Sequence, residues 1–168
     1  MTDSPSSASV VLRPALADDV EWIAELRAEV LRADLERLGR YDEIRVRQRF
    51  RDAFEPAQTR IIVVDAVDVG SVALRSDGEI RWLEHFYIAA SHQGRGVGGR
   101  VLGMVLDDTG PYRLNVLRGS PARRLYERHG FVLDTQDDVD VFMTLDRTGQ
   151  TSTGQTSARR TGEGSDGR

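Results

Sequence analysis

The sequence predicts a single domain of the α/β (α+β) class, in which a mixed central sheet of about six to seven strands is flanked by about four helices. Its 168 residues suffice for one domain with a substantial core. Apolar residues recur at helical spacing in some segments and alternate with polar residues in others. Three consecutive strand patterns precede two helices that each lead into a further strand, so the sheet combines antiparallel and parallel pairing.

The first elements are a short strand and two helices. Residues 10–13 (VVLR) read as a strand that a proline closes. Asp18 or Asp19 can cap the next helix. The apolar positions of this helix recur at helical spacing up to a glycine, at Val20, Ile23, Leu26, Val30, Leu31, Leu35 and Leu38. A second helix, over residues 42–54, ends before Pro56.

The remaining elements begin with three strands, whose connecting turns centre on Asp68 and on residues 76–78. A glycine-rich turn follows, and then a helix, a strand, a second helix and two strands. The element order is therefore β-α-α-β-β-β-α-β-α-β-β. The expected ranges are 60–67, 69–75 and 79–89 for the three strands, then 97–108, 112–117, 121–129, 131–133 and 140–145.

Both ends of the chain are polar. We expect residues 1–9 and 146–168 to be disordered and residues 10–145 to form the domain. The C-terminal segment repeats TGQTS in tandem and has no aliphatic side chain larger than alanine. Such a segment cannot bury enough apolar surface to offset the entropy lost on ordering.

Composition limits the classes of function. The absence of cysteine excludes disulfides, thiolate metal sites and a cysteine nucleophile. No apolar run approaches the roughly 18 residues of a membrane helix, and the N-terminus has no apolar signal region. No spacing of His, Asp and Glu suggests a metal site. We therefore expect a cytoplasmic protein that binds neither metal nor membrane.

Charge is unevenly distributed along the chain. The net charge of −4 argues against nucleic acid as a partner. Between residues 93 and 128, however, seven arginines accompany three acidic residues: Arg95, Arg100, Arg113, Arg118, Arg123, Arg124 and Arg128, with Asp107, Asp108 and Glu127. This basic island predicts one anionic ligand at one place. The alternative is ordinary surface arginine on two helices.

The glycine-rich turn can hold a phosphate. Helix N-termini leave N–H groups unpaired, and glycine lets an anion approach them closely. A plain turn is the alternative. A P-loop would need Gly-Lys-Ser/Thr, and no acidic residue ends a later strand as a dinucleotide site requires. The residues of the turn are Gln93, Gly94, Arg95, Gly96, Val97 and Gly98, and a helix starts within them.

A second motif, over residues 120–131 (SPARRLYERHGF), is a helix with clear ends. Ser120 suits the N-cap, and Pro121 suits the first helical position. Gly130 suits the left-handed position after the helix, where Phe131 can make the accompanying apolar contact. Tyr126 is not needed for these ends, so it is either a partly buried core residue or a phenol directed at a ligand.

Taken together, these motifs resemble the GNAT superfamily of acyl-CoA-dependent N-acetyltransferases. The strand residues 86–88 (FYI) with the turn QGRGVG match its acetyl-CoA signature Q/R-x-x-G-x-G/A, and residues 122–131 match its A-x-x-L-Y-x-x-x-G-F helix. The element order extends the resemblance over the whole expected domain. Two differences stand out. Ala90 occupies a position that is often proline, and Ser120 one that is often asparagine, which loses an amide contact to coenzyme.

The resemblance implies a set of site residues. The diphosphate of acetyl-CoA would lie on the amides of the turn, from Gln93 to Gly98. Its pantetheine would pair with the backbone of Phe86, Tyr87 and Ile88. Asn115, at the end of a strand that splays away, and Arg123 would be further coenzyme contacts. Tyr126 would protonate the departing thiolate.

The chemistry of the residues agrees with direct transfer. Without cysteine there is no acyl-thioenzyme, so an amine would attack acetyl-CoA directly. A thiolate with a pKa of about 8.5 leaves, and a phenol is a reasonable acid for it. Alternation places Glu84 on the strand face of Phe86 and Ile88, which suggests a base acting through water. An exposed, ion-paired glutamate is the alternative interpretation of Glu84. His85 is an alternative base, but alternation places it on the other face of the strand.

The sequence therefore predicts an N-acetyltransferase that uses acetyl-CoA to acetylate a primary amine of a small molecule or peptide. The alternative is a coenzyme-A-binding sensor or interaction module without catalysis. In the superfamily that the chain resembles, the segment between the first two helices, here residues 32–43, usually forms a wall of the acceptor site. In this chain it contains Asp34, Glu36, Asp42 and Glu43, which hint at a cationic acceptor. Many members of the superfamily form homodimers, and this chain is compatible with one.

Overall fold

In the part of the chain that the structure describes, four α-helices and seven strands follow one another in the order that the sequence predicts. The computed structural model describes residues 8–107 and 110–147. The elements are β1 (Val10–Pro14), α1 (Val20–Arg37), α2 (Glu43–Ala53), β2 (Thr59–Val64), β3 (Val67–Asp77), β4 (Ile80–Ile88), α3 (Val97–Val105), β5 (Gly110–Leu117), α4 (Ala122–Arg128), β6 (Val132–Gln136) and β7 (Asp140–Arg147). Three 3₁₀ turns, Ala17–Asp19, Pro56–Gln58 and Ala90–His92, join some of them.

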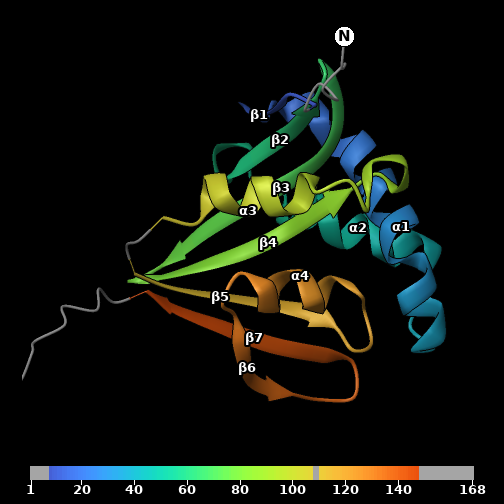
Figure 1. The fold of residues 1–168 in the computed structure, drawn as a ribbon. Coiled ribbons are helices and arrows are strands. Elements are labelled where there is room, and N and C mark those ends of the chain that lie inside the picture. The colour runs from blue at the N-terminus through green and yellow to red at the C-terminus, as the bar shows by residue number, and fades with distance from the viewer. Residues whose placement is uncertain (1–7, 108–109, 148–168) are drawn as a thin grey trace, which may run out of the picture.

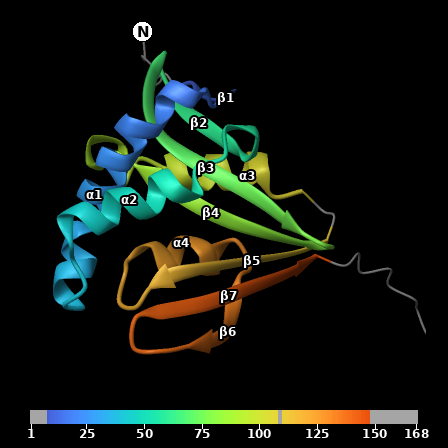
Figure 2. The same ribbon diagram turned by 180° about the vertical axis from the view of Figure 1, so that it is seen from behind.

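The strands form one sheet in the order β1-β2-β3-β4-β5-β7-β6, with helices on both faces (Figures 1 and 2). Helices α3 and α4 cover one face, and α1 and α2 cover the other. Each face has its own apolar cluster. The first contains Leu83, Val101 and Tyr126, and the second contains Ile23, Phe50 and Tyr87. Burial of these two clusters is the main source of stability for the fold.

The parallel pair β4–β5 separates along its length. Only Arg81 with Tyr112 and Trp82 with Arg113 are in register, whereas every other neighbouring pair is antiparallel and longer. Beyond these two positions the strands diverge toward their C-terminal ends, as Figures 1 and 2 show. The sheet is therefore continuous at one end and open at the other.

A β-bulge interrupts β4 next to this opening. Ala73 of β3 faces Glu84, but Ser71 faces Tyr87, so β4 carries one extra residue at this place. His85 has a positive φ of 48° there, and its carbonyl accepts a hydrogen bond from the Ser71 hydroxyl (2.8 Å). The bulge shifts the inside–outside alternation of every residue that follows it in β4.

Several predicted boundaries differ from the structure. The β2–β3 turn lies at Asp65 and Ala66, both with positive φ, and not at Asp68. The Asp65 carboxylate accepts a hydrogen bond from the Ser9 N–H (2.9 Å), whereas Asp68 instead bonds Arg13, and this explains the choice of turn. Helix α3 ends at Val105, three residues early, and the predicted end at Asp108 lies outside the described residues.

The predicted helix caps also need correction. Asp19 precedes α1 but does not cap it, because its carboxylate bonds Arg13 and the indole N–H of Trp22. The Arg13 guanidinium accordingly holds the pKa of Asp19 well below its usual value. Helix α4 begins at Ala122 after an N-cap at Pro121, one residue later than predicted. Asp42 caps α2, and Gly130 has the expected positive φ of 92°.

Strand β7 extends to Arg147, two residues beyond the predicted domain end, and the described chain begins at residue 8. The rest of the two segments predicted to be disordered, residues 1–7 and 148–168, lies outside the described residues. None of the helices in the described part of the chain is long and apolar enough to cross a membrane.

Candidate active site

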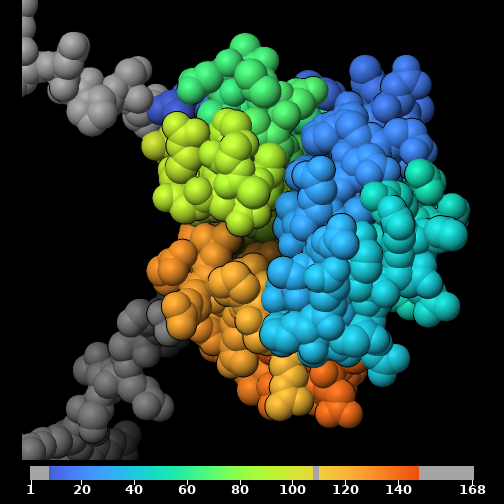
Figure 3. Space-filling model, turned by 90° about the vertical axis from the view of Figure 1, so that its right-hand side faces the viewer, coloured from blue at the N-terminus to red at the C-terminus, as the bar shows by residue number. Residues whose placement is uncertain are grey.

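A cavity of about 900 Å³ lies where β4 and β5 separate. Both strands line it, with residues 83–87 on one side and 115–117 on the other, and α1, α2, α4 and the β6–β7 turn complete its walls. Figure 3 shows the hollow between the yellow-green surface around α3 and the orange surface around α4, with α1 beside it. Because the sheet is open here, residues from both of its faces reach one space.

Strand β4 supplies three of the predicted coenzyme contacts. Phe86 and Tyr87 line the cavity, and Ile88 lies just beyond them at the strand end. Tyr87 is buried, and its hydroxyl accepts a hydrogen bond from Arg27 (2.6 Å). The Ile88 carbonyl accepts one from the side-chain amide of Gln93 (2.7 Å). This contact ties the end of β4 to the glycine-rich turn.

Glu84 lines the cavity on the face opposite to the predicted one. Because of the bulge, Phe86 and Ile88 pack against the cluster that contains Leu83, so Glu84 lies on the other side of β4. The predicted shared face is therefore wrong. The Glu84 carboxylate accepts hydrogen bonds from Arg75 at 2.9 and 3.2 Å, as an ion-paired glutamate would.

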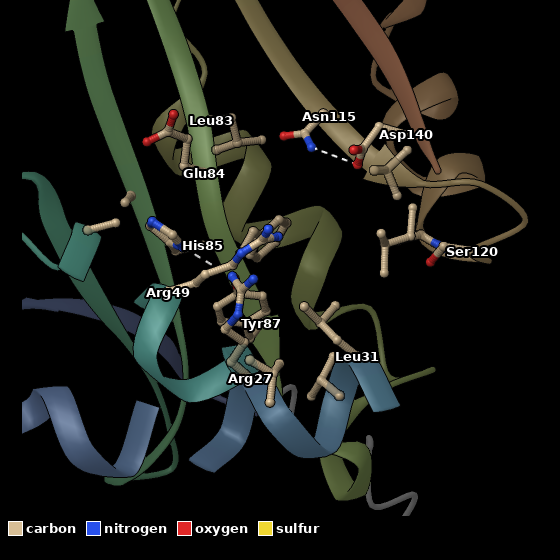
Figure 4. A pocket seen from close by; sticks show the side chains of 18 of the residues that line it. Arg27, Leu31, Arg49, Leu83, Glu84, His85, Tyr87, Asn115, Ser120 and Asp140 are labelled. Atoms are coloured by element: carbon tan, nitrogen blue, oxygen red, sulfur yellow. Dashed lines mark hydrogen bonds between the residues drawn. The ribbon is translucent and has the colours of Figure 1, made fainter. Parts of the chain in front are cut away.

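His85 lies in the same cavity, although alternation predicts it on the face opposite to Glu84. Its ring packs edge-on against Phe50 of α2, and Nδ1 lies 3.2 Å from the Tyr87 hydroxyl (Figure 4). Burial, and then the positive charge of Arg27, lower the pKa of His85, and Glu84 acts in the opposite direction. The imidazole is therefore neutral at pH 7 and can accept a proton.

Tyr126 reaches the cavity from α4. Its ring lies between Phe86 and Phe131, at centroid distances of 6.4 and 5.9 Å. The hydroxyl makes no hydrogen bond with any residue in 8–107 or 110–147. Burial raises the pKa of Tyr126 well above its usual value, so it is a neutral phenol at physiological pH. A buried phenol with an uncommitted hydroxyl in a cavity is available as a hydrogen-bond donor.

The glycine-rich turn leads from the end of β4 into α3. Gly94 and Gly96 have φ of 69° and 77°, and open space lies where a side chain would start at either position. The first hydrogen bond of α3 runs from Arg100 N–H to the Gly96 carbonyl, which leaves the amides of Val97, Gly98 and Gly99 without intrahelical partners. The turn thus has the open backbone that a diphosphate requires.

Gly98 has a separate structural role. A Cβ at this position would lie 2.9 Å from Leu125 Cδ2 of α4 and 3.5 Å from Ile88 Cδ1. The absence of a side chain lets α3 approach α4 and the end of β4 closely. Arg95, between the two left-handed glycines, is exposed to solvent.

The remaining predicted contacts are dispersed. Asn115 lines the cavity and donates a hydrogen bond to Asp140 (2.9 Å; Figure 4), whereas Arg123 pairs with Glu127 along α4. The predicted basic island is not one patch. Arg113 lines a separate small pocket next to Trp82, and Arg118 lies 3.8 Å from Asp138.

The α1–α2 side of the cavity differs from the sequence-based expectation. Of the four acidic residues thought to mark a cationic acceptor, only Asp34 lines the cavity, and it is paired with Arg37 (2.8 Å). Glu36 pairs with Arg32, Asp42 caps α2, and Glu43 lies 3.8 Å from Arg47. Arginines that the sequence did not predict as site residues line this wall instead: Arg27, Arg40, Arg45 and Arg49. The four-residue spacing of Arg45 and Arg49 was a signal for a shared helix face.

Within residues 8–107 and 110–147, no group of three or more His, Asp or Glu side chains could hold a metal ion.

Residues 57–133 match the family model described as "Acetyltransferase (GNAT) domain". The chain carries a GNAT acetyltransferase domain. This match includes β2 to α4 with the glycine-rich turn and Tyr126, and it confirms the resemblance predicted from the two motifs. It places the chain among the acyltransferases of the N-acetyltransferase type.

Solved structures share the fold of this GNAT domain. The PaiA N-acetyltransferase from Thermoplasma acidophilum, in complex with coenzyme A, has a TM-score of 0.64 at 18% identity and covers 82% of this chain and 99% of its own. The ribosomal-protein-S18-alanine N-acetyltransferase from Escherichia coli has a TM-score of 0.64 at 13% identity, and the match covers 86% of this chain and 98% of that protein. An N-acetyltransferase from Staphylococcus aureus Mu50 has a TM-score of 0.63 at 15% identity, and the match covers 80% of this chain and 100% of that protein. None of the curated proteins matches the sequence.

Proposed function

We propose that this chain transfers an acetyl group from acetyl-CoA to a primary amine of a small molecule or peptide, by direct attack of the amine in a ternary complex. The separation of β4 from β5 carries the proposal. Direct transfer requires two substrates to meet, and the opening in the sheet gives one cavity access to groups from both faces. Tyr126 belongs to the α3–α4 face, and Glu84 and His85 to the α1–α2 face.

The donor side is the edge of β4 with the glycine-rich turn. The amides of Val97, Gly98 and Gly99 and the positive end of the α3 dipole would hold the diphosphate, with Gly94 and Gly96 leaving room for it. The backbone of Phe86, Tyr87 and Ile88 would hold the pantetheine along the unpaired side of β4. When bound, acetyl-CoA supplies the activated acetyl group and a thiolate leaving group.

Tyr126 is the proposed acid. Its hydroxyl donates to the sulfur as the C–S bond breaks and the amine forms the new C–N bond. The raised pKa of Tyr126 favours this role at neutral pH because the proton stays on the phenol until it is needed. It also limits the role, since transfer of the proton to a thiolate of pKa about 8.5 is uphill. Stabilisation of the leaving sulfur by a hydrogen bond is therefore the larger part of the effect.

The incoming amine must lose a proton, and two side chains compete to accept it. Glu84, the predicted base, is already engaged by Arg75. His85 is neutral, lines the same cavity and has no hydrogen bond at Nε2 to any described residue. We propose His85 as the base, with Glu84 and its water-mediated route as the competing assignment.

Tyr126→Phe tests the proposed function. We expect kcat to fall about hundredfold, as is usual on loss of a general acid, while the Kd for acetyl-CoA stays nearly constant. The melting temperature should not change, because the hydroxyl bonds no described residue. These three values would be measured by thiol release, calorimetry and thermal unfolding. An unaltered kcat would remove Tyr126 from the mechanism and favour a coenzyme-A-binding module without catalysis.

A further inference from the structure

Four arginines form one wall of the cavity, which we call the arginine wall: Arg27, Arg40, Arg45 and Arg49. Arg27 extends from α1, Arg45 and Arg49 from α2, and Arg40 from the segment between the two helices. In Figure 4, the side chains of Arg27 and Arg49 extend into the space beside Tyr87 and His85. The wall therefore lies beside the proposed base, on the side where the amine would enter.

Helix α2 shows that these arginines differ from ordinary surface arginines. Arg47 and Arg51 pair with Glu25 and Glu21 of α1 at 2.7 and 2.8 Å. Arg45 and Arg49, each two residues earlier, share another face of the helix and line the cavity. Neither they nor Arg27 and Arg40 make an ion pair with any residue in 8–107 or 110–147. The arginines that face α1 are neutralised, and those that face the cavity are not.

Arg27 adds a buried donor without an acceptor. One of its terminal nitrogens donates to the Tyr87 hydroxyl (2.6 Å), and the guanidinium lies 5.8 Å from the centre of that ring. Its Nε is buried and bonds no described residue. An unsatisfied buried donor on a cation is unfavourable unless a ligand supplies the missing acceptor.

None of the acidic residues that line the cavity forms an ion pair with the arginine wall in the described part of the chain, and each accepts a hydrogen bond from another group. Asp34 accepts from Arg37, and Glu84 from Arg75. At the far end, Asp140 accepts from Asn115, and Asp137 from backbone amides of its own turn. The last acidic residue, Glu55, accepts from the Ala57 N–H.

We propose that the amine acceptor carries an anionic group, a carboxylate or a phosphate, and that the arginine wall binds this group. Guanidinium groups match the oxygens of both anions with paired hydrogen bonds. With the anion on Arg27 and Arg49, the amino group lies near His85, as in an α-amino acid or an amino sugar phosphate. This inference rests on the proposed function and replaces the expectation of a cationic acceptor.

Matched pairs of amines test the inference in the full chain. Glycine and phenylalanine would be compared with glycinamide and phenylalaninamide, which lack the carboxylate, and glucosamine 6-phosphate with glucosamine. Spermidine serves as a cationic amine. In the carboxylate pairs or in the phosphate pair, we expect kcat/KM to be at least about tenfold higher for the amine that carries the anion. A tenfold change corresponds to the usual stabilisation by hydrogen bonds to a charged group. The pair that shows the preference identifies the anion.

Two arginines of α2 provide a matched variant and control. Arg49→Ala should raise the KM of the preferred anionic amine about tenfold, and Arg49→Glu should raise it further, while the KM of its neutral partner stays constant. Arg51→Ala, on the α1-facing side of the same helix, should leave the preference intact. Binding of the same amine to the protein loaded with coenzyme A, measured by calorimetry, should weaken in parallel with the KM.

Two results would contradict the inference. One is equal or better turnover of glycinamide, glucosamine or spermidine than of the anionic amines. The other is an anion preference that survives Arg49→Glu. Either result leaves the proposed function intact, because acetyl-CoA is still consumed. Failure to bind acetyl-CoA would instead contradict the proposed function.

Discussion

His85 shows how a single backbone position can change the chemistry of the site. A positive φ at a residue other than glycine is unfavourable, and such positions concentrate at functional sites. Here the Ser71 hydroxyl, Phe50 and Tyr87 hold the residue in place. The bulge that results puts Glu84 and His85 on the same side of β4, which an uninterrupted strand would not do.

The assignment of the base can be tested by pH profiles. If neutral His85 accepts the proton of the amine, kcat/KM should fall as the pH drops through the lowered pKa of His85, which lies below the usual value of about 6.5. His85→Asn should abolish this limb, and asparagine tolerates a positive φ. Glu84→Gln should retain it. The reverse pattern, in which only Glu84→Gln loses the limb, would assign the base to Glu84.

The pH dependence of folding stability provides an independent readout of the His85 imidazole. Since its pKa is lowered in the folded state, the unfolded chain binds more protons below about pH 6.5, so stability falls as the pH falls. Thermal unfolding of His85→Asn should show less of this decline. This measurement separates the titration of His85 from protonation of the amine substrate, which also lowers activity in acid.

At the scale of elements, α3 and its preceding turn depend on backbone geometry more than on side chains. Gly96 has a positive φ and precedes the unpaired amides of the helix, while Gly98 lets α3 pack closely against Leu125 of α4. The spacing of the glycines allowed a phosphate-binding turn to be predicted from the sequence, because turn glycines act through the backbone and need no distant partner. The arginine wall depends on how two helices pack, and the sequence contains little of that information.

A pair of glycine variants tests the turn. Gly96→Ala and Gly78→Ala place a side chain at similar φ values, 77° and 62°, with open space around both. Each should lower the stability by about 1–2 kcal/mol. Gly96→Ala alone should weaken acetyl-CoA binding, by about tenfold in Kd, because the amides of the turn are displaced from an anion. Equal acetyl-CoA affinity of the two variants in calorimetry would refute the assignment of the turn.

For the whole molecule, the element order and the family could be predicted from the sequence because local periodicity and two motifs specify them. The errors occur where distant residues decide. Asp65 lies in the β2–β3 turn, where its carboxylate accepts a hydrogen bond from the Ser9 N–H. The Asp19 carboxylate pairs with Arg13 and does not cap the helix. The face of Glu84 depends on a register shift against β3. The pairing of Asp34 and Glu36 with Arg37 and Arg32 is, by contrast, local in the sequence. The cationic acceptor that these acidic residues suggested stays a prediction, which our inference of an anionic acceptor opposes.

We propose that acetyl transfer to an amine takes place in the opening between β4 and β5. The most direct measurement is thiol release from acetyl-CoA by the purified chain, with and without amines, together with quantification of the acetylated amine. We predict thiol release that depends on the amine and is matched one to one by acetylated product. Thiol release that is independent of every amine, or absent although acetyl-CoA binds, would contradict it.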